Sequence, residues 1–271
     1  MVPSGYPFVL LPVKGWLGKS LGQRIVAFLS LVYSIFCVLL LFVRDKPWAV
    51  VGTGGYTSFP VILVGMVLGC RTVLLEENKV AGLTTKFLAP FVSAVALAFH
   101  NTVGIRARRV VVTGLPLRNP RLVPKEQACK HFGFDSRVPV LFVFGGSQGA
   151  RRLNRTIVKL VPEMEGWQFL IQTGDKDFEW VNESLKGRAG VVVKEFIHEM
   201  HYAYASASVV VCRAGAMTIA ELRNVAKPAV LVPFPYATHN HQYFNALEMV
   251  KEGRGILIAV SYTHLTLPTK A

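Results

Sequence analysis

The stretch VPVLFVFGGSQGARRLN, residues 138–154, indicates the fold more clearly than any other part of the chain. Its apolar half has the length and composition of a buried strand, and the residues after the glycines suit a helix. A glycine turn between a strand and a helix presents the amide end of that helix to an anion. The stretch therefore predicts an α/β domain with a phosphate-binding turn.

The same alternation recurs on both sides of this stretch. Residues 47–69 and 71–91 each read as a strand, a turn and a helix, and residues 92–99 and 108–114 read as two further strands. After residue 154, apolar strands and helices alternate again up to a helix that ends in glycine at 253–255. Alternating short strands and helices predict parallel sheets covered by helices, with ligands at the carboxyl ends of the strands. The predicted fold class is α/β, with two Rossmann-like domains.

The domain boundary is predicted from a change in composition. Residues 115–139 carry four prolines and mixed charge, which is typical of a connection between domains. We therefore expect one domain over 1–117 and a second over 118–260. The tail SYTHLTLPTKA, 261–271, has neither helical nor strand periodicity and is left out of the fold prediction.

The composition limits the class of partner. The chain has 271 residues, of which 52% are hydrophobic, and it carries 30 Lys and Arg against 16 Asp and Glu, a net charge of +14 with neutral histidines. Such a balance predicts an anionic partner: nucleic acid, an acidic membrane face or a phosphorylated substrate. Nucleic acid is the weakest of these, because the chain has no RNP motif, zinc-finger spacing or long basic block. Its four cysteines are scattered without a CxxC pair, which favours a reduced cytosolic setting.

An apolar segment near the N-terminus raises the question of a membrane. Residues 25–43 contain no charge and are flanked by basic residues on both sides. Their number alone would allow a transmembrane helix. The internal polar residues and the strand and glycine loop that follow at once favour a core or interfacial helix over a span.

Three glycine turns follow predicted strands, namely GTGG at 52–55, GGSQGA at 145–150 and RAGAM at 213–217. None is followed by GK[ST], which disfavours an NTPase, and none forms GxGxxG with an acidic residue about twenty positions later. One such turn alone is compatible with plain strand-to-helix geometry, whereas three favour a phosphorylated ligand. Ser147 and Gln148 could hydrogen-bond a phosphate or a base. Arg151 and Arg152 could pair with phosphate or form a solvated helix face.

Four further polar segments can each be interpreted as part of a binding site or as ordinary structure. Glu221 could accept hydrogen bonds from a ribose diol or be an ordinary surface glutamate. The amide and imidazole side chains of HNHQYFNA, 239–246, are suited to hydrogen-bond sugar hydroxyls, whereas a metal site there lacks a third ligand. HEMH, 198–201, has the wrong spacing for HExxH zinc chemistry. The adjacent glutamates of EEN, 76–78, are expected to be exposed at a strand end.

Six segments together resemble the bacterial MurG family, UDP-N-acetylglucosamine–N-acetylmuramyl-(pentapeptide) pyrophosphoryl-undecaprenol N-acetylglucosamine transferases. They are, in chain order, GGYTSFP, LLEENKVAGLTTKFLA, FGGSQGARRLN, EFIHEM, CRAGAMTIAEL and VPFPYATHNHQYFNA. The resemblance covers roughly residues 5–260 and implies a GT-B fold, with two Rossmann-like domains facing across a cleft. It also implies inverting transfer of GlcNAc from UDP-GlcNAc to lipid I (undecaprenyl-pyrophosphoryl-MurNAc-pentapeptide), which forms lipid II for peptidoglycan. No cofactor or metal is implied.

The resemblance also assigns residues to the two substrates. It implies donor contacts from Ser147 to the nucleotide, from the Ile197 backbone to uracil, from Glu221 to ribose and from Gln242 to GlcNAc. The full implied donor set is Asn78, Arg118, Ser147, Ile197, Ala216, Met217, Thr218, Ile219, Ala220, Glu221 and Gln242. Gly54, Gly55 and Tyr56 match a loop that faces the acceptor diphosphate. The family is peripheral on the cytoplasmic face of the plasma membrane, so residues 16–43 would dock on an anionic membrane surface.

Two departures from the family pattern qualify these expectations. His241 stands where a second glutamine is usual, which predicts altered sugar contacts. The family's opening GGTGGH loop, whose histidine is a candidate base, and its final helices have no counterpart in this sequence, so the chain resembles a truncated member and no catalytic base is assigned. The alternatives are another GT-B transferase that carries a UDP-sugar to a lipid, or a catalytically silent protein that binds only donor or membrane.

Overall fold

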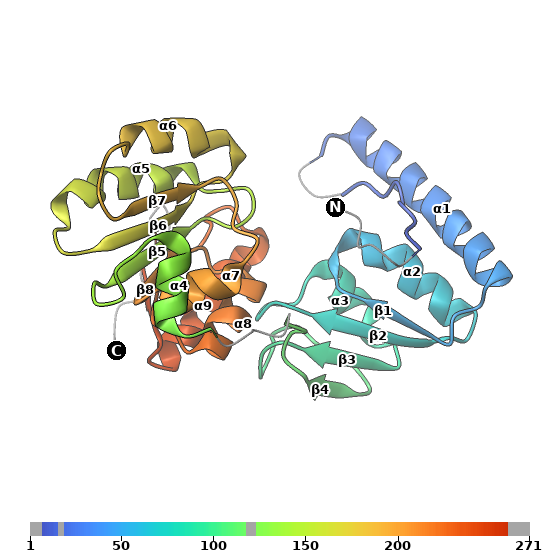
Figure 1. Ribbon diagram of the computed structural model, residues 1–271. Helices are drawn as coiled ribbons and strands as arrows, with labels where there is room; N and C mark the ends of the chain where they lie inside the picture. The colour runs from blue at the N-terminus through green and yellow to red at the C-terminus, as the bar shows by residue number, and fades with distance from the viewer. Residues whose placement is uncertain (1–6, 16–18, 118–122, 260–271) are drawn as a thin grey trace, which may run out of the picture. The chain divides into compact units, whose positions relative to one another are not determined.

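The structure is a computed structural model that describes residues 7–15, 19–117 and 123–259. The chain divides into two compact units, Met1–Leu115 and Pro116–Ala271, and each is described by itself (Figure 1). The tail left out of the fold prediction lies outside the described residues.

Unit 1 consists of a parallel four-stranded sheet with helices on it. Its elements are α1 (Leu21–Arg44), β1 (Ala49–Gly52), α2 (Gly55–Val67), β2 (Arg71–Glu76), α3 (Leu83–Leu88), β3 (Ala94–Leu97) and β4 (Val110–Val112). The strands lie in the order β1-β2-β3-β4, so each strand pairs with the next along the chain. α2 packs on β1 and β2, and α1 packs on the far side of α2 (Figure 1).

Helix α1 is mostly exposed. Only Ala27, Ser34 and Val38 are buried along its 24 residues, and their spacing of seven and four places them on one narrow stripe. The stripe faces α2, the element that α1 contacts. Of the two positions expected for this segment, core or interfacial, the structure excludes the core, because most of its apolar side chains are exposed. It is the one helix of the described residues that is long and apolar enough to cross a membrane.

Unit 2 contains a six-stranded parallel sheet. Its strands are β5 (Val140–Phe144), β6 (Gln168–Gln172), β7 (Val191–Lys194), β8 (Val209–Cys212), β9 (Ala229–Leu231) and β10 (Gly255–Leu257). Its helices are α4 (Lys125–Phe132), α5 (Arg151–Leu160), α6 (Phe178–Ser184), α7 (Met200–Ser206), α8 (Ala216–Val225) and α9 (His241–Lys251), with short 3₁₀ turns η1 (Val161–Glu163), η2 (Asp175–Asp177) and η3 (Thr238–Asn240).

The strand order of unit 2 defines where a ligand can bind. The order is β10-β9-β8-β5-β6-β7. β6 and β7 therefore extend the sheet on one side of β5, and β8, β9 and β10 extend it on the other side. The topological switch point therefore lies between β5 and β8, and the crevice outside their carboxyl ends is the usual ligand position in such sheets. β5 is apolar and buried at all five positions, as expected for a central strand covered on both faces.

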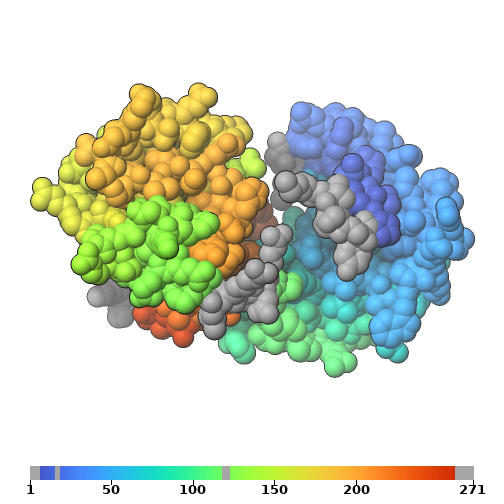
Figure 2. All heavy atoms as spheres, in the orientation of Figure 1, coloured from blue at the N-terminus to red at the C-terminus, as the bar shows by residue number. Residues whose placement is uncertain are grey.

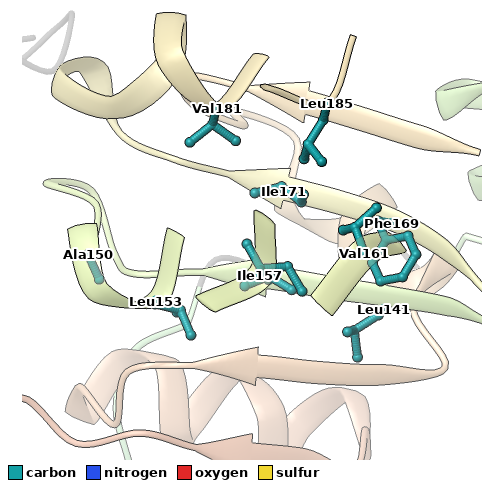
Figure 3. Packing of buried hydrophobic residues seen from close by; sticks show 10 residues of the cluster. Leu141, Ala150, Leu153, Ile157, Val161, Phe169, Ile171, Val181 and Leu185 are labelled. Atoms are coloured by element: carbon teal, nitrogen blue, oxygen red, sulfur yellow. The ribbon is translucent and has the colours of Figure 1, made fainter. Parts of the chain in front are cut away.

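A compact apolar core fixes the strands around this crevice. Leu141, Phe169 and Ile171 of the sheet pack against Ile157 of α5 and Val181 of α6, and all are at least nine-tenths buried (Figure 3). The core holds α5 on the sheet, so the position of the glycine loop between β5 and α5 is fixed at both ends.

The predicted connection at residues 115–139 contains a helix that its prolines concealed. Pro124 precedes the first residue of α4, and Gly133 ends the helix in the left-handed conformation at φ 75°. Proline at a helix start and glycine just past its end are favoured positions for both residues. The segment is therefore part of unit 2, where α4 packs on α7.

Candidate functional site

The glycine loop after β5 requires its glycines. A Cβ on Gly149 would lie 2.0 Å from the Thr173 carbonyl oxygen, and Gly149 has φ +73°. A Cβ on Gly145 would lie 2.5 Å from the Ala150 nitrogen. The loop thus runs in backbone contact with the segment after β6, and its close packing leaves the start of α5 open at the switch point.

The polar side chains of this loop and helix separate into two groups. Ser147 and Gln148 are exposed on the loop. The Arg151 guanidinium instead turns to the Asp177 carboxylate, with its Nε 2.9 Å from Oδ1. Of the two readings for Arg151, phosphate ligand or solvated face, the structure agrees with the solvated face, because the side chain is 63% exposed while its Nε is held by the buried acid.

Asp177 organises the region behind the loop. Its carboxylate is 4% exposed and accepts hydrogen bonds from Arg151, from Asn154 Nδ2 and from Trp180 Nε1, each at 2.9 Å. Burial of the carboxyl raises its pKa, but the bonds from Trp180, Asn154 and Arg151 lower it by more, so the net pKa lies below the ordinary value. The acid is therefore ionised in the native state and ties α5 to α6.

Gln172 links two loops that are distant in the sequence. Its Nε2 donates to the Gly146 carbonyl at 3.3 Å, and its Oε1 accepts the Ile197 backbone N–H at 2.9 Å. The side chain is 3% exposed at the end of β6. The bond to Gln172 occupies the Ile197 amide and leaves the carbonyl as the backbone group that could meet a base. The signal for Gln172 was present as a polar residue ending the apolar strand WQFLIQ, but its role depends on contacts distant in sequence.

Arg213 is a second residue that the sequence patterns did not assign to the site. Its Nη1 donates to the carbonyls of Val232 at 3.0 Å and Pro233 at 2.9 Å, and its guanidinium lies 5.7 Å from the Phe234 ring centroid. Burial lowers its pKa, and the charge of Arg152 lowers it further. The side chain joins the end of β8 to the loop after β9 and brings a positive charge to the switch point. An arginine directly after a buried strand was the available signal.

One groove of about 880 Å³ contains several of these groups. Gly145, Gln148, Arg152, Arg213 and Gln242 are among the residues that line it. The structure therefore brings the glycine loop and the predicted sugar-reading glutamine to the same hollow.

The helix α8 begins at this edge of the sheet with Gly215 as its N-cap. Met217 is 42% exposed, and Thr218 and Ala220 are half-buried. Ile219 differs from these neighbours, because its side chain is fully buried and its N–H donates within the helix to Gly215. The helix start can thus offer its first amides to an anion, whereas Ile219 only fixes the helix to the core.

A second, smaller pocket of about 350 Å³ contains Glu221. Met217, His198 and Tyr204 also line it, and Ala216 at the start of α8 is 8% exposed. The Glu221 carboxylate accepts a hydrogen bond from the Tyr204 hydroxyl at 2.7 Å. Glu221 is therefore not the ordinary surface glutamate of the alternative reading, since a buried tyrosine holds it in a pocket.

Gln242 and His241 occupy the start of α9 with defined orientations. Gln242 Oε1 accepts the Phe234 backbone N–H at 2.8 Å, which leaves its amide hydrogens for a ligand. His241 Nδ1 lies 2.8 Å from the Thr238 carbonyl, an acceptor, so Nδ1 carries the proton and Nε2 of the neutral ring can accept. His239 and Asn240 before them have φ 54° and 53°, a left-handed pair that turns the chain into the helix.

In unit 1 the predicted acceptor loop forms the start of α2. Gly54 is the N-cap at φ 80°, and Gly55 and Tyr56 are exposed in the first turn. A Cβ on Gly54 would lie 3.8 Å from Thr85 Oγ1, a fully buried hydroxyl without a hydrogen-bond partner among the described residues. The loop presents a 13-residue helix N-terminus beside an unused hydroxyl.

Asn78 is presented by a loop that Glu76 holds in place. Glu76 is 3% exposed, and its carboxylate accepts the backbone N–H groups of Asn78 and Gly82, both at 3.1 Å. The expectation of exposure was wrong for Glu76, whose buried carboxylate accepts hydrogen bonds from two half-buried residues. For Glu77, burial raises the pKa of the carboxyl and the charge of Glu76 raises it further.

Arg118 lies outside the described residues. Among the residues that are described, no group of three His, Cys, Asp or Glu side chains is placed to hold a metal ion.

Family comparisons agree for both units. The Glycosyltransferase family 28 N-terminal domain matches residues 2–97, and the Glycosyltransferase family 28 C-terminal domain matches residues 140–270. Among curated proteins, the UDP-N-acetylglucosamine–N-acetylmuramyl-(pentapeptide) pyrophosphoryl-undecaprenol N-acetylglucosamine transferase of Chlorobium limicola is 38% identical over 271 residues. That alignment covers 97% of this chain and 74% of the relative. The transferase of the same name from Chlorobium phaeobacteroides is 38% identical, with 94% and 72% covered.

Solved structures give the same result for the fold. The crystal structure of Acinetobacter baumannii MurG is 28% identical and superposes with a TM-score of 0.69, covering 86% of this chain and 66% of that one. The glycosyltransferase of kitacinnamycin superposes at 0.65 with 15% identity, which supports the fold alone. The predicted GT-B fold class, with two α/β domains built on parallel sheets, is confirmed.

Proposed function

The chain belongs to the family of UDP-N-acetylglucosamine–N-acetylmuramyl-(pentapeptide) pyrophosphoryl-undecaprenol N-acetylglucosamine transferases, and from this premise we propose that it transfers GlcNAc from UDP-GlcNAc to lipid I. The product is lipid II, the lipid-linked precursor of peptidoglycan. Unit 2 binds the donor, and unit 1 binds the acceptor and the membrane.

The observation that carries the proposal is the arrangement at the switch point of unit 2. The glycine loop, the Arg213 guanidinium and Gln242 line one groove where β5 and β8 end, and α8 begins shortly after β8. Together they offer backbone amides and a positive charge to a diphosphate and hydrogen-bond donors to a sugar. A nucleotide sugar requires these three kinds of group in one place.

The individual roles that we propose in donor binding are those that the family pattern implies. Ser147 contacts the nucleotide from the loop, and the Ile197 carbonyl meets the uracil edge, while Glu221 accepts hydrogen bonds from the ribose diol. Gln242 donates to the GlcNAc hydroxyls through its free amide group. His241 offers Nε2 as an acceptor where a second glutamine is usual, so the sugar still meets one donor and one acceptor. Asn78, in unit 1, stays a predicted donor residue of the family pattern.

The acceptor diphosphate is assigned to the start of α2. Gly54 and Gly55 allow its first amides to approach a phosphate, and the helix dipole favours negative charge there. Tyr56 is 52% exposed in the same turn and can donate its hydroxyl to the lipid-linked diphosphate. When the bond to the sugar breaks, the amides at the start of α8 stabilise the charge that develops on UDP.

Helix α1 is assigned to the membrane surface. Its exposed large apolar residues include Phe28, Leu29, Phe36, Leu40 and Val43, each at least half exposed. The side chains of α1 form part of the visible surface of unit 1 (Figure 2).

The geometry of α1 favours a position in the membrane plane over a span. One stripe of the helix packs on α2, which in turn packs on the sheet, so lipid cannot surround α1 on all sides. Lys14, Lys19, Arg44 and Lys46 at its two ends can contact anionic headgroups. The protein is accordingly peripheral on the cytoplasmic face of the plasma membrane.

A transfer assay on vesicles tests this function. With a lipid I analogue in anionic vesicles and radiolabelled UDP-GlcNAc, we expect labelled lipid to form and one UDP to be released for each sugar transferred. Flotation of the vesicles should carry the protein at low salt and release at least part of it at about 1 M salt, because charge attraction is then screened.

Two other outcomes would indicate a different function, and a third would change the membrane assignment. Equal transfer from UDP-glucose would indicate a less specific UDP-sugar transferase. Donor binding without labelled lipid would indicate a catalytically silent protein. Complete retention on vesicles at high salt would contradict the peripheral assignment and favour a spanning helix.

A further inference from the structure

A buried tyrosine lies directly behind the carboxylate assigned to ribose. Tyr204 is on α7 and is 3% exposed, and its hydroxyl donates to Glu221 Oε2 at 2.7 Å. Both residues line the smaller pocket of unit 2. The distance is short, as is typical of a hydroxyl that donates to an ionised carboxylate.

The tyrosine ring is fixed by its neighbours. Its edge packs against Phe142 and Phe144 of the central strand β5, with ring centroids 5.8 and 6.2 Å apart. These contacts hold α7 on β5 and restrict the orientation of the tyrosine ring and its hydroxyl. Burial, and then the Glu221 charge, raise the pKa of Tyr204, so the phenol remains a hydrogen-bond donor at neutral pH.

We propose that Tyr204 is a positioning residue that holds the Glu221 carboxylate for recognition of a ribose diol. The inference rests on the proposed function, in which Glu221 accepts from the ribose hydroxyls. A glutamate on a helix surface has three rotatable bonds and would sample several orientations. The bond from Tyr204 to Oε2 restricts the orientation of the carboxylate, which lines the pocket together with Tyr204.

The proposal predicts that Tyr204 contributes to selectivity as well as to affinity. A site built to accept hydrogen bonds from substrate hydroxyls rejects an analogue that lacks them, because the buried acceptor is left unpaired. The analogue is strongly rejected only if the carboxylate is held in place and cannot rotate to another hydrogen-bond partner. Loss of the Tyr204 hydroxyl should therefore weaken binding of a diol-bearing nucleotide more than binding of a nucleotide without the diol.

The experiment is a calorimetric titration of UDP and of 2′,3′-dideoxy-UDP into the wild-type protein and into Tyr204→Phe. We expect the substitution to weaken UDP binding about five- to twentyfold, as for loss of a hydrogen bond to a charged group, and to change dideoxy-UDP binding by less than about twofold. The wild-type preference for UDP over the dideoxy nucleotide should fall by the same factor. Tyr202→Phe on the same helix is the matched control and should leave both affinities unchanged.

The outcomes separate this inference from the function on which it rests. Wild-type protein that binds neither nucleotide would overturn the donor site and the inference together. Wild-type protein that prefers UDP, combined with a Tyr204→Phe variant that keeps the same preference, would overturn the positioning role alone. Equal weakening of both nucleotides in Tyr204→Phe would also overturn it, because a general disturbance of the pocket lowers both affinities and leaves their ratio unchanged.

Discussion

Gly149→Ala is expected to lower the free energy of unfolding by about 3 kcal/mol or more and to abolish measurable UDP binding. The new Cβ would lie 2.0 Å from the Thr173 carbonyl oxygen, far inside contact distance, on a residue with φ +73°. The left-handed conformation alone costs an alanine about 1–2 kcal/mol, and forced movement of packed backbone costs about 1–3 kcal/mol more. The loop must move away from β6, and the phosphate-facing amides move with it.

Gly146→Ala provides the matched control in the same loop. Gly146 has φ +90°, but no atom lies within 4 Å of the position that the new Cβ would occupy, so only the conformational cost of about 1–2 kcal/mol applies. Urea denaturation followed by circular dichroism gives both values. Equal losses in the two variants would show that contact with the β6 segment does not determine the loop.

Asp177→Ala is expected to lower the free energy of unfolding by about 2–4 kcal/mol. The change leaves the buried Asn154 amide, the Trp180 indole N–H and the Arg151 guanidinium without their shared acceptor. Asp175→Ala, at an exposed carboxylate two residues earlier, should change stability by less than about 0.5 kcal/mol. Thermal and urea denaturation at pH 7 measure both, and similar losses in the two variants would contradict the assigned network.

The Asp177 carboxylate is expected to cause part of the loss of stability at acid pH. The native pKa of Asp177 lies below its ordinary value of 3.8, so the folded state binds a proton less readily than the unfolded state. The stabilisation is therefore fully present above about pH 4 and is lost as the pH falls through the native pKa. Between about pH 5 and pH 2 the wild-type protein should lose more stability than Asp177→Ala, and parallel pH profiles would contradict the ionised network.

Much of the architecture follows from short-range patterns in the sequence. Alternating apolar strands and helices predict both parallel sheets, and the glycine turns locate the carboxyl ends of β1, β5 and β8. The helix α4 was concealed because proline breaks a helix in its interior but is compatible with a helix start, and Pro124 lies immediately before the first residue of α4. For α1 the sequence left a core and an interfacial position open, since an apolar segment has the same pattern in both, and exposure in the structure excludes the core.

The candidate site was predictable in its loops and less so in the buried groups that hold them. Gln172 and Tyr204 act on partners 17 to 26 residues away in the sequence, and Asp177 reaches Arg151 and Asn154, 26 and 23 residues away, so no local pattern indicates these bonds. Arg151 was interpreted from its place at a helix start, and its long side chain instead reaches a buried acid just before the next helix. Roles of this kind depend on how the sheet brings distant loops together.

The assignment of unit 2 is tested most directly by titrating UDP-GlcNAc, UDP-glucose and UDP into the wild-type protein, Glu221→Ala and Gln242→Ala. We predict that the wild-type protein binds UDP-GlcNAc more tightly than UDP-glucose. Glu221→Ala should weaken both donors by a similar factor, because the ribose is common to them. Gln242→Ala should weaken UDP-GlcNAc with little effect on UDP. Wild-type protein that binds neither donor, or that binds both equally and is unaffected by either substitution, would contradict the assignment of unit 2 as the UDP-GlcNAc site.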